Sequence, residues 1–472
     1  MFRGDRVLVA GAGVTGRSVA AALVDMGAEV TVTDGNPERL AELAVHGARL
    51  VPGLNAPPEG TSLVVTSPGW RPSSPLLTAA AAAGVEVIGD VELAWRIGQE
   101  LPRPPVWLAV TGTNGKTTTV GMLESILRAA GQDAVACGNV GFAVLDAVLA
   151  GHEVLAVELS SYQLHWSNTL APLASVVLNV AEDHLDWHGS LAEYAAAKGT
   201  IHDRASTVVH NAADEWSARL ADAHAPEGAV RTAFSLATPR SGELGVVEDL
   251  LVDRAFVADP VHAAEELATL ADVRPAGPHN VANALAAAAL ARANGVPAHA
   301  VAEGLRAYRP AAHRAVEVGE VGGVRYVNDS KATNPHAAAG SLHAHPNVVW
   351  IAGGQLKGAS VDELVAGAAD RLRGVVLLGI DADVIAAAVA RHAPDVPVRR
   401  LLPGDDEPMT TAVSAAGALA RPGDVVLLAP AAASLDMFRD YAHRGDAFVS
   451  AVRALPEPDG VDGAREQHHD GG

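Results

Sequence analysis

The chain has 472 residues and a formal net charge of −21, from 34 Lys and Arg against 55 Asp and Glu. That length predicts two to four domains, and so acidic a composition argues against binding to nucleic acid or anionic lipid. A single cysteine, Cys137, excludes a disulfide framework and a Cys-rich zinc site and is typical of a reducing compartment. No apolar run reaches the roughly 18–20 residues that cross a bilayer, and the start MFRGDRVLVAGAG does not resemble a signal peptide. We therefore expect a cytoplasmic protein without membrane insertion.

Short Val- and Leu-rich runs alternate with Ala-rich helical stretches along most of the chain, which predicts βαβ units around parallel sheets. The first domain is expected at residues 1–102. Its strands are expected at Arg6–Ala10, in EVTVTD up to Asp34, and in LVVTSPG from residue 63. Three prolines within Leu101–Pro105 favour an extended linker at the end of this domain.

The second domain is expected at residues 103–310 and the third at 311–455. The second opens with the strand VWLAV and closes with two helices, HNVANALAAAALARANG and VPAHAVAEGLRAY. The strands expected in the third lie near residues 324–328, 347–352, 374–379 and 424–429. The polar tail at 456–472 is expected to be disordered.

A glycine fingerprint, Gly11-x-Gly13-x-x-Gly16, lies between the first predicted strand and a predicted helix, and Asp34 ends the next strand. In this context glycines admit a pyrophosphate and an acid accepts ribose hydroxyls, so NAD binding is one interpretation. The N–H groups of a helix N-terminus attract any pyrophosphate, so another nucleotide carrier is a second interpretation. Tight packing of the strand on the helix is a third, and the fingerprint alone does not decide among them.

The segment WLAVTGTNGKTTTV carries a second phosphate-binding signal, because a hydrophobic strand leads into a glycine loop and then a helix. Backbone N–H groups of the loop would wrap phosphates, Lys116 would reach the β- and γ-phosphate oxygens, and the Thr117 hydroxyl could ligate Mg²⁺. Only two residues separate Gly112 from Gly115, so the loop is a variant of the GxxxxGK[ST] pattern. We predict ATP binding; the alternative is an exposed Gly/Thr turn.

Two later segments offer ligands for a metal. Glu158 ends the predicted strand VLAVE, and Asp183 and His184 follow another strand in VVLNVAEDHLDWHG. Open α/β sheets bind ligands at the carboxyl ends of their strands. Either segment alone could equally be a helix cap or a solvated loop, but two such segments after a phosphate loop favour Mg²⁺ binding.

Taken together, these motifs resemble the Mur ligase family, whose members use ATP to add amino acids to the UDP-linked precursor of peptidoglycan. The matching segments are TGTNGKTTT (111–119), GNVG (138–141), ELSSYQL (158–164), NVAEDHLDWHG (179–189), YAAAK (194–198), HNVANALAA (279–287) and HR (313–314). Two more segments are similar to the branch that adds D-glutamate to UDP-N-acetylmuramoyl-L-alanine, namely NDSKATN (328–334) and APAAASLDMFRDYAHRGDAF (429–448). The resemblance covers roughly residues 5–455.

The resemblance implies an α/β fold of three domains: an N-terminal Rossmann-like domain that binds the UDP moiety, a central P-loop ATPase-like parallel sheet, and a C-terminal Rossmann-like domain. It implies that ATP phosphorylates the L-alanine carboxylate and that the amine of D-glutamate then displaces phosphate. The implied cofactors are ATP and Mg²⁺, with two ions expected. The implied partners are UDP-N-acetylmuramoyl-L-alanine and D-glutamate, and a monomer is expected.

The resemblance also assigns site residues, position by position. The ATP site would comprise Gly112, Thr113, Asn114, Gly115, Lys116, Thr117, Thr118, Asn280, Arg314, Asp329 and Lys331. The UDP site would comprise Gly13, Val14, Thr15 and Asp34, and the D-glutamate site Thr333, Lys357, Ser434 and Tyr441. One Mg²⁺ would bind Thr117 and Glu158, and the second His184 and Lys198. The catalytic residues would be Lys116, His184, Lys198 and Asn139, the last of these near the reacting muramoyl-alanine.

Some of these residues also have an ordinary structural interpretation. Asn280 and Asn283 could merely cap or decorate a helix, Lys357 could be a solvated lysine, and Ser434 could cap a helix over LDMFRDY. Lys198, near the end of a helix, could be a solvated lysine favoured by the helix dipole, and an ammonium cannot ligate a metal. The resemblance implies that Lys198 is carbamylated by CO₂, which would make it a carboxylate-like ligand.

Three alternative functions remain open from the residues alone. A related ligase could use another amino acid, such as L-glutamate. An NAD-dependent oxidoreductase would account for GAGVTG and Asp34 but for none of the later motifs. A non-catalytic phosphate-loop module would bind nucleotide without releasing phosphate.

Overall fold

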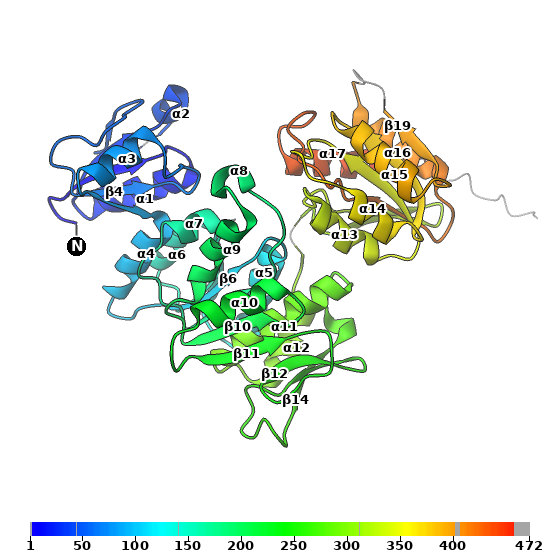
Figure 1. The fold of residues 1–472 in the computed structure, drawn as a ribbon, viewed down its shortest axis with the longest axis horizontal. Coiled ribbons are helices and arrows are strands. Elements are labelled where there is room, and N and C mark those ends of the chain that lie inside the picture. The colour runs from blue at the N-terminus through cyan, green and yellow to red at the C-terminus, as the bar shows by residue number, and fades with distance from the viewer. Residues whose placement is uncertain (1, 44, 140, 311, 402–405, 457–472) are drawn as a thin grey trace, which may run out of the picture. The chain divides into compact units, whose positions relative to one another are not determined.

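The computed structural model describes residues 2–43, 45–139, 141–310, 312–401 and 406–456. The tail that we expect to be disordered lies outside the described residues from residue 457 onward. The chain divides into two compact units, Met1–Arg309 and Pro310–Gly472. Within the described ranges, the first unit contains two β-sheets and the second contains one (Figure 1).

The N-terminal sheet has the strand order β3-β2-β1-β4-β5, and every pairing in it is parallel. Its strands are β1 (Arg6–Ala10), β2 (Glu29–Thr33), β3 (Arg49–Leu50), β4 (Leu63–Thr66) and β5 (Glu86–Gly89). Its helices are α1 (Val14–Asp25), α2 (Pro37–Ala41), α3 (Pro75–Ala82) and α4 (Asp90–Gln99). The chain runs from β1 to β2 on one side and later to β4 on the other. The loop after β1 therefore lies at a switch point of the sheet, where open α/β sheets bind ligands.

Helix α4 joins this sheet to the rest of the first unit. Its Glu92 side chain is fully buried and accepts hydrogen bonds from the backbone N–H groups of Asn168 and Thr169 at 2.8 and 2.9 Å. The Thr169 hydroxyl and Arg96 Nε donate to the same carboxylate at 2.6 and 2.8 Å. Burial raises the pKa of Glu92, but these hydrogen bonds outweigh it and hold the pKa below its usual value. The end of the first predicted domain is thus anchored to the second.

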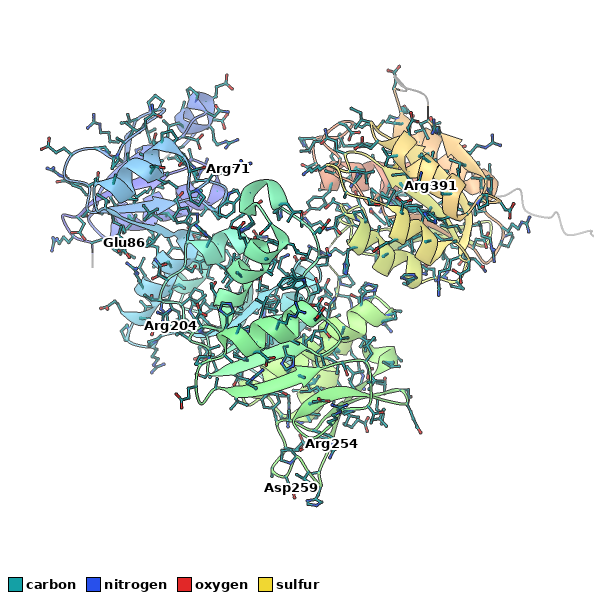
Figure 2. All side chains as sticks on the ribbon, in the orientation of Figure 1. Arg71, Glu86, Arg204, Arg254, Asp259 and Arg391 are labelled. Carbon is teal, nitrogen blue, oxygen red and sulfur yellow. The ribbon has the colours of Figure 1, made fainter. Side chains whose placement is uncertain are left out.

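The central sheet has the strand order β14-β13-β12-β11-β10-β9-β6-β8-β7. Its strands are β6 (Val106–Thr111), β7 (Ala134–Gly138), β8 (Val154–Glu158), β9 (Ala174–Val177), β10 (Thr207–Asn211), β11 (Val230–Phe234), β12 (Glu243–Val247), β13 (Leu250–Asp253) and β14 (Glu265–Thr269). Neighbouring strands from β7 to β12 are parallel. Strands β12, β13 and β14 pair antiparallel and extend one edge, where Arg254 follows β13 (Figure 2).

The helices of this region surround the sheet, and one of them lies in the core. They are α5 (Lys116–Ala129), α6 (Val144–Leu149), α7 (Ser161–His165), α8 (Leu185–His188), α9 (Leu191–Gly199), α10 (Glu215–His224), α11 (Pro278–Ala293) and α12 (Ala298–Ala307). In α11, residues 284–291 have no exposed surface and pack against α5 and strands β9 to β11. Burial on all sides explains why this helix lacks a polar stripe.

The sheet of the second unit has the order β15-β16-β20-β17-β18-β19, parallel except for the β15–β16 pair. Its strands are β15 (Val316–Val321), β16 (Val324–Asn328), β17 (Val348–Gly353), β18 (Leu372–Leu378), β19 (Val398–Arg400) and β20 (Val425–Leu428). Its helices are α13 (Pro335–His343), α14 (Asp362–Ala368), α15 (Ala382–His392), α16 (Pro408–Leu419) and α17 (Tyr441–Arg453). Core clusters lie on both faces of the sheet.

The three-domain α/β architecture predicted from the sequence is confirmed, and β1 and β16 have the predicted bounds. One prediction was wrong: LDMFRDY does not form a helix, because residues 435–440 form turns and bends. Helix α17 begins at Tyr441, and its N-cap is Asp440, whose Oδ1 accepts a hydrogen bond from His443 N at 2.7 Å. The domain boundaries at residues 102 and 310 stay predictions. Among the described residues, no helix combines the length and apolar character that crossing a membrane requires.

Candidate active site

The phosphate loop predicted at residues 112–117 joins β6 to α5 in the middle of the central sheet. β6 lies between β8 and β9, and the chain reaches these neighbours in opposite directions, so the loop occupies a switch point. Gly112 and Gly115 have φ of 151° and 86°, which side chains rarely adopt. A Cβ at Gly115 would lie 2.3 Å from Asn283 Oδ1. The loop therefore needs glycine at this position for both conformation and space.

Asn179, which follows β9, fastens the loop to the sheet. Its carbonyl accepts from Thr113 N at 2.9 Å, and its Oδ1 accepts from Asn114 N at 2.9 Å. Its Nδ2 donates a hydrogen bond to Asn114 O at 3.1 Å. The sequence analysis assigned no role to Asn179, since nothing local in NVAEDH marks this asparagine as the partner of a loop 65 residues away.

Two lysine side chains converge on one carbonyl of the loop. Lys116 Nζ donates to Gly112 O and to Thr113 O, each at 2.9 Å. Lys198 Nζ donates to the same Gly112 O at 2.9 Å. The Nζ atoms of both lysines thus lie at the end of β6, where the Lys116 ammonium would meet a phosphate bound by the loop N–H groups.

Lys198 is not the solvated lysine that its local sequence would allow, since its side chain is 1% exposed. Its Nζ lies 4.4 Å from the centre of the Tyr194 ring, and the Tyr194 hydroxyl lies 3.2 Å from Thr113 Oγ1. Burial, and after it the charge of Lys116, lowers the pKa of Lys198 well below its usual value, while Asp183 and Glu158 act in the opposite direction. The environment therefore favours a neutral amine more than solvent does.

Glu158 ends β8 beside the phosphate loop and brings two further site residues together. Its Oε2 accepts from Thr117 Oγ1 at 2.5 Å, and its Oε1 accepts from Asn139 Nδ2 at 3.1 Å. The hydroxyl and carboxylate oxygens are the hard donors that Mg²⁺ prefers. Mg²⁺ in nucleotide sites uses one or two protein carboxylates together with phosphates and water. The donor set fits this ion, although the described residues contain no group of three His, Cys, Asp or Glu side chains that could hold a metal.

His184 follows β9 in a left-handed conformation, with φ 53°. Its Nε2 lies 3.5 Å from Asp183 Oδ2, and its ring centre lies 4.9 Å from that of Tyr162 and 6.3 Å from that of Tyr194. His184 and Lys198 thus flank the same tyrosine ring. Tyr194 had no predicted role either, although it contacts the phosphate loop and Lys198.

Asn280 and Asn283 lie on the first turns of α11 behind the phosphate loop, 4% and 7% exposed. Asn283 Nδ2 donates to Asn280 Oδ1 at 3.3 Å. The N-cap of α11 is Gly277, so Asn280 lies on the helix but does not cap it. Thr118 lies in the first turn of α5 and is also buried.

In the N-terminal sheet, Gly13 and Val14 are exposed at the start of α1, next to the partly buried Thr15. Both Asp34 oxygens accept backbone N–H groups, Oδ2 from Ala12 and Oδ1 from Asn36, each at 2.8 Å. Asp34 therefore holds the glycine loop against the end of β2, and its carboxylate is engaged by backbone in this structure.

The remaining predicted residues lie in the second unit. Asp329 follows β16 and accepts hydrogen bonds from Ala315 N at 3.2 Å and from the Ser341 hydroxyl. Burial raises the pKa of Asp329 to about 6, against these bonds and the nearby charge of Arg314. Lys331 Nζ lies 4.0 Å from the centre of the Tyr441 ring, a cation–π contact between two predicted ligand residues.

The residues predicted to bind D-glutamate surround one edge of the same sheet. Thr333 precedes α13, Lys357 follows β17, Ser434 follows β20, and Tyr441 is the first residue of α17. Ser434 is buried, whereas Lys357 is exposed and has φ 54°. Because β16, β20 and β17 are parallel neighbours, their carboxyl ends bring these segments together.

This fold and these groups define an α/β nucleotide-binding protein with a phosphate loop at the centre of a parallel sheet. Three domain families match the chain: "Mur ligase MurD-like, N-terminal domain" over residues 5–89, "Mur ligase middle domain" over 110–291, and "Mur ligase, glutamate ligase domain" over 313–432. The chain belongs to the Mur ligase family. The oxidoreductase interpretation of the glycine fingerprint is therefore dropped.

Named relatives cover almost the whole chain. The UDP-N-acetylmuramoylalanine–D-glutamate ligase of Thermobifida fusca is 58% identical over 464 residues, which are 96% of this chain and 99% of the relative. The protein of the same name from Streptomyces coelicolor is 57% identical over 466 residues, with the same shares of both chains. The crystal structure of UDP-N-acetylmuramate-alanine ligase from Thermotoga maritima gives a TM-score of 0.58 at 18% identity, over 95% of this chain and 99% of that one. At this identity the likeness concerns the fold alone.

Proposed function

We propose that this chain joins D-glutamate to UDP-N-acetylmuramoyl-L-alanine and converts ATP to ADP and phosphate in peptidoglycan precursor synthesis. One observation carries the proposal: Lys116 and Lys198 both donate to Gly112 O at the phosphate loop, beside the Thr117–Glu158 pair. The 57–58% identity to ligases of that name supports the same three substrates.

The first chemical step makes the carboxylate reactive. A carboxylate does not acylate an amine at neutral pH because its oxygen is a poor leaving group. An oxygen of the L-alanine carboxylate attacks the γ-phosphorus of ATP, the bond to the β–γ bridging oxygen breaks, and ADP leaves. Phosphoryl transfer depends on positioning and charge neutralisation. Lys116 would turn its ammonium from the loop carbonyls to the β- and γ-phosphate oxygens.

The second step forms the amide. The amine of D-glutamate attacks the acyl carbon, the tetrahedral intermediate expels phosphate, and the nitrogen loses a proton. Thr333, Lys357, Ser434 and Tyr441 would orient the amino acid, and Asn139 would contact the muramoyl-alanine end. When bound, Mg²⁺ would neutralise phosphate charge; Thr117 and Glu158 would hold one ion and His184 with Lys198 a second.

The nucleotide and UDP contacts are proposed in the same way. The loop residues 112–118 would bind the phosphates of ATP, and Asn280, Arg314, Asp329 and Lys331 would hold its adenine, ribose or phosphates. Gly13, Val14 and Thr15 lie at the start of α1, where backbone N–H groups have no partner within the helix and the helix dipole favours a pyrophosphate. Asp34 would contribute to UDP binding by holding the glycine loop in place through its hydrogen bond from Ala12 N.

The direct test is phosphate release with ATP, UDP-N-acetylmuramoyl-L-alanine and a panel of D- and L-amino acids. We expect turnover with D-glutamate and little with L-glutamate or D-aspartate. Equal turnover with several amino acids would contradict the assigned specificity. Thermal shift adds a second readout: ATP with Mg²⁺ and the UDP precursor should stabilise the protein, and NAD should not.

We also propose that Lys198 is carbamylated in the active enzyme. The neutral amine adds to CO₂, forms an N–C bond and releases a proton, which leaves a carboxylate-like group. The burial of Lys198 and its lowered pKa support this, because the amine must spend time unprotonated to react.

The test of carbamylation compares Lys198→Ala with Lys116→Ala, each assayed with and without acetate or formate. Lys198→Ala should lose most activity and regain part of it with the free acid, which can occupy the vacated position. Lys116→Ala should lose at least about 100-fold in rate, because phosphate charge is left unneutralised, and should gain nothing from the acid. Full activity of Lys198→Ala, or rescue of both variants alike, would refute the modification.

The chain is further proposed to act as a monomer in the cytoplasm. The proposed location is supported by the use of ATP, which is a cytoplasmic substrate, and by Cys137, which is free and buried. Light scattering of the purified protein with and without substrates tests the oligomeric state.

A further inference from the structure

A fully buried arginine lies at the carboxyl edge of the sheet in the second unit. Arg444 is on the first turn of α17, and its side chain has no exposed surface. Its Nε donates to Ser330 Oγ at 3.0 Å and its Nη2 to Ser330 O at 2.9 Å. Its Nη1 donates to Ala432 O at 3.1 Å and, more weakly, to Gly353 O at 3.4 Å. The fork of the guanidinium is thus occupied on every nitrogen.

These acceptors belong to three segments that leave neighbouring parallel strands. Ser330 follows β16, Gly353 ends β17, and Ala432 follows β20, which lies between those two strands. The Ser330 hydroxyl also donates to Tyr441 O at 2.8 Å, which ties the start of α17 to the same cluster. One side chain therefore fixes three strand ends and one helix start relative to each other, which only the planar, five-donor guanidinium can do.

The same segments carry the residues proposed to bind the amino-acid substrate. Thr333 lies three residues after Ser330, Lys357 four residues after Gly353, and Ser434 two residues after Ala432. Tyr441 lies one turn before Arg444 on α17. A shift of any one segment would move one of these side chains against the others.

The charge of Arg444 is not balanced by a contact. In residues 312–401 and 406–456 the four acceptors of Arg444 are neutral oxygens. The charge of Asp436 acts on Arg444, but the Asp436 carboxylate accepts its hydrogen bond from Ile380 N. Burial lowers the pKa of Arg444 to about 10, so the group remains cationic at neutral pH. Among the described residues Arg444 forms no salt bridge, and the charge of Asp436 acts on it without a direct contact, so this buried cation creates a positive potential that is poorly screened by water.

We propose that Arg444 is a positioning residue of the amino-acid site: it holds three strand ends in register and supplies the positive field that favours a substrate with two carboxylates. The role rests on the proposed function and deepens it. Arg444 would act through the backbone of its neighbours and through its field, without touching D-glutamate.

The test measures KM and kcat in the phosphate-release assay for four variants of the full chain. Arg444→Met should raise the KM for D-glutamate about 10- to 100-fold, since it removes charge-assisted bonds to buried acceptors. Arg444→Lys should raise it less, because an ammonium keeps the charge but cannot reach three segments. Ser330→Ala should raise it severalfold while keeping the charge. Arg453→Met, at the exposed end of the same helix, is the matched control and should leave both constants unchanged.

Two readouts separate positioning from general destabilisation. The KM for the UDP precursor should stay within twofold in every variant, and the melting temperature is recorded for each. If Arg444→Met does not fold, the KM values of Arg444→Lys and Ser330→Ala for D-glutamate test the positioning role. Folded variants with an unchanged KM for D-glutamate, or with losses only in kcat that follow the melting temperature, would overturn the role. Failure of the wild type to turn over D-glutamate would instead contradict the proposed function.

Discussion

The Glu158 side chain links a proposed metal ligand to a proposed substrate residue, since it accepts hydrogen bonds from both Thr117 and Asn139. We expect Glu158→Gln to lower kcat by about 100-fold or more, because the amide removes the negative charge that would hold Mg²⁺ near developing phosphate charge. The Mg²⁺ concentration for half-maximal rate should rise as well. Phosphate release over a Mg²⁺ titration measures both effects.

The matched control for this substitution is Glu153→Gln. Glu153 precedes the same strand at its other end and is exposed. It should have the kinetics and Mg²⁺ dependence of the wild type. A Glu158→Gln enzyme within threefold of wild type would show that the carboxylate does not hold the metal.

Residues inside a motif could be predicted, whereas residues that support a motif from elsewhere could not. Lys116, Thr117 and Glu158 were found because strand, loop and helix signals stand in the sequence around them. Asn179 and Tyr194 were not, because their partners in the phosphate loop lie 65 and 81 residues away. The engagement of Asp34 with backbone N–H groups was equally invisible, since fingerprint spacing does not specify what the acid contacts.

The phosphate loop and the far end of α5 offer a matched pair of glycines. Gly115 and Gly131 both have positive φ, 86° and 77°, but only at Gly115 would a Cβ meet another group, Asn283 Oδ1 at 2.3 Å. Both alanine variants should lose about 1–2 kcal/mol of stability from the left-handed backbone. Only Gly115→Ala should also lower kcat/KM for ATP, by at least about tenfold, because the loop must shift. Equal kinetics for the two variants would contradict a tightly packed loop.

The short helix Thr200–His202, which follows α9, contains a histidine that makes the stability of the protein depend on pH. His202 is fully buried, and its Nδ1 lies 2.7 Å from Ser175 Oγ. Burial, with smaller contributions from His224, His210 and Arg231, lowers the pKa of His202 to about 3. The unfolded chain binds a proton near pH 6.5, so stability is full above that pH and falls as pH drops toward 3.

Because of His202, we expect the free energy of unfolding to be about 2 kcal/mol lower at pH 5 than at pH 7.5. His202→Asn keeps a polar partner for Ser175 and should lose less stability over that interval than the wild type. His262→Asn, at an exposed histidine, should lose as much as the wild type. Denaturant unfolding at the two pH values measures the difference, and identical losses in all three proteins would contradict the assignment.

Elements with a strong local signal were predicted well, and edge elements were not. Strands β1 and β16 have the predicted bounds because four of the five residues in each are buried. The antiparallel strands β12 to β14 were missed: β12 and β14 expose part of their residues, so they lack a continuous apolar run. The segment LDMFRDY reads as helical, but Asp440 caps the next helix and sets its start.

The use of lysine over the whole chain supports the assigned sites. Only four of the 34 basic residues are lysine, namely Lys116, Lys198, Lys331 and Lys357, and each lies at an assigned position. Surface ion pairs such as Arg219–Glu215 and Arg391–Asp362 use arginine instead. Figure 2 labels Arg391 in the second unit. Lysine differs from arginine in its compact charge and in its ability to lose a proton. The four lysines thus stand at the positions where the proposed phosphate, carboxylate and CO₂ chemistry would need a small, deprotonable amine.

This distribution predicts that an amine-directed acylating reagent inactivates the enzyme by modifying very few groups. Lys357 should react first because it is exposed, and Lys198 last because it is 1% exposed. Activity should fall as Lys357 and Lys331 are acylated, while circular dichroism stays unchanged, since neither group forms part of a core. D-glutamate with ATP and Mg²⁺ should slow the loss. Mass spectrometry identifies each modified residue, and the extent of its modification is compared with the residual activity.

Full acylation of Lys357 and Lys331 with activity retained would show that these lysines are ordinary surface residues, and that the bias toward arginine carries no functional information.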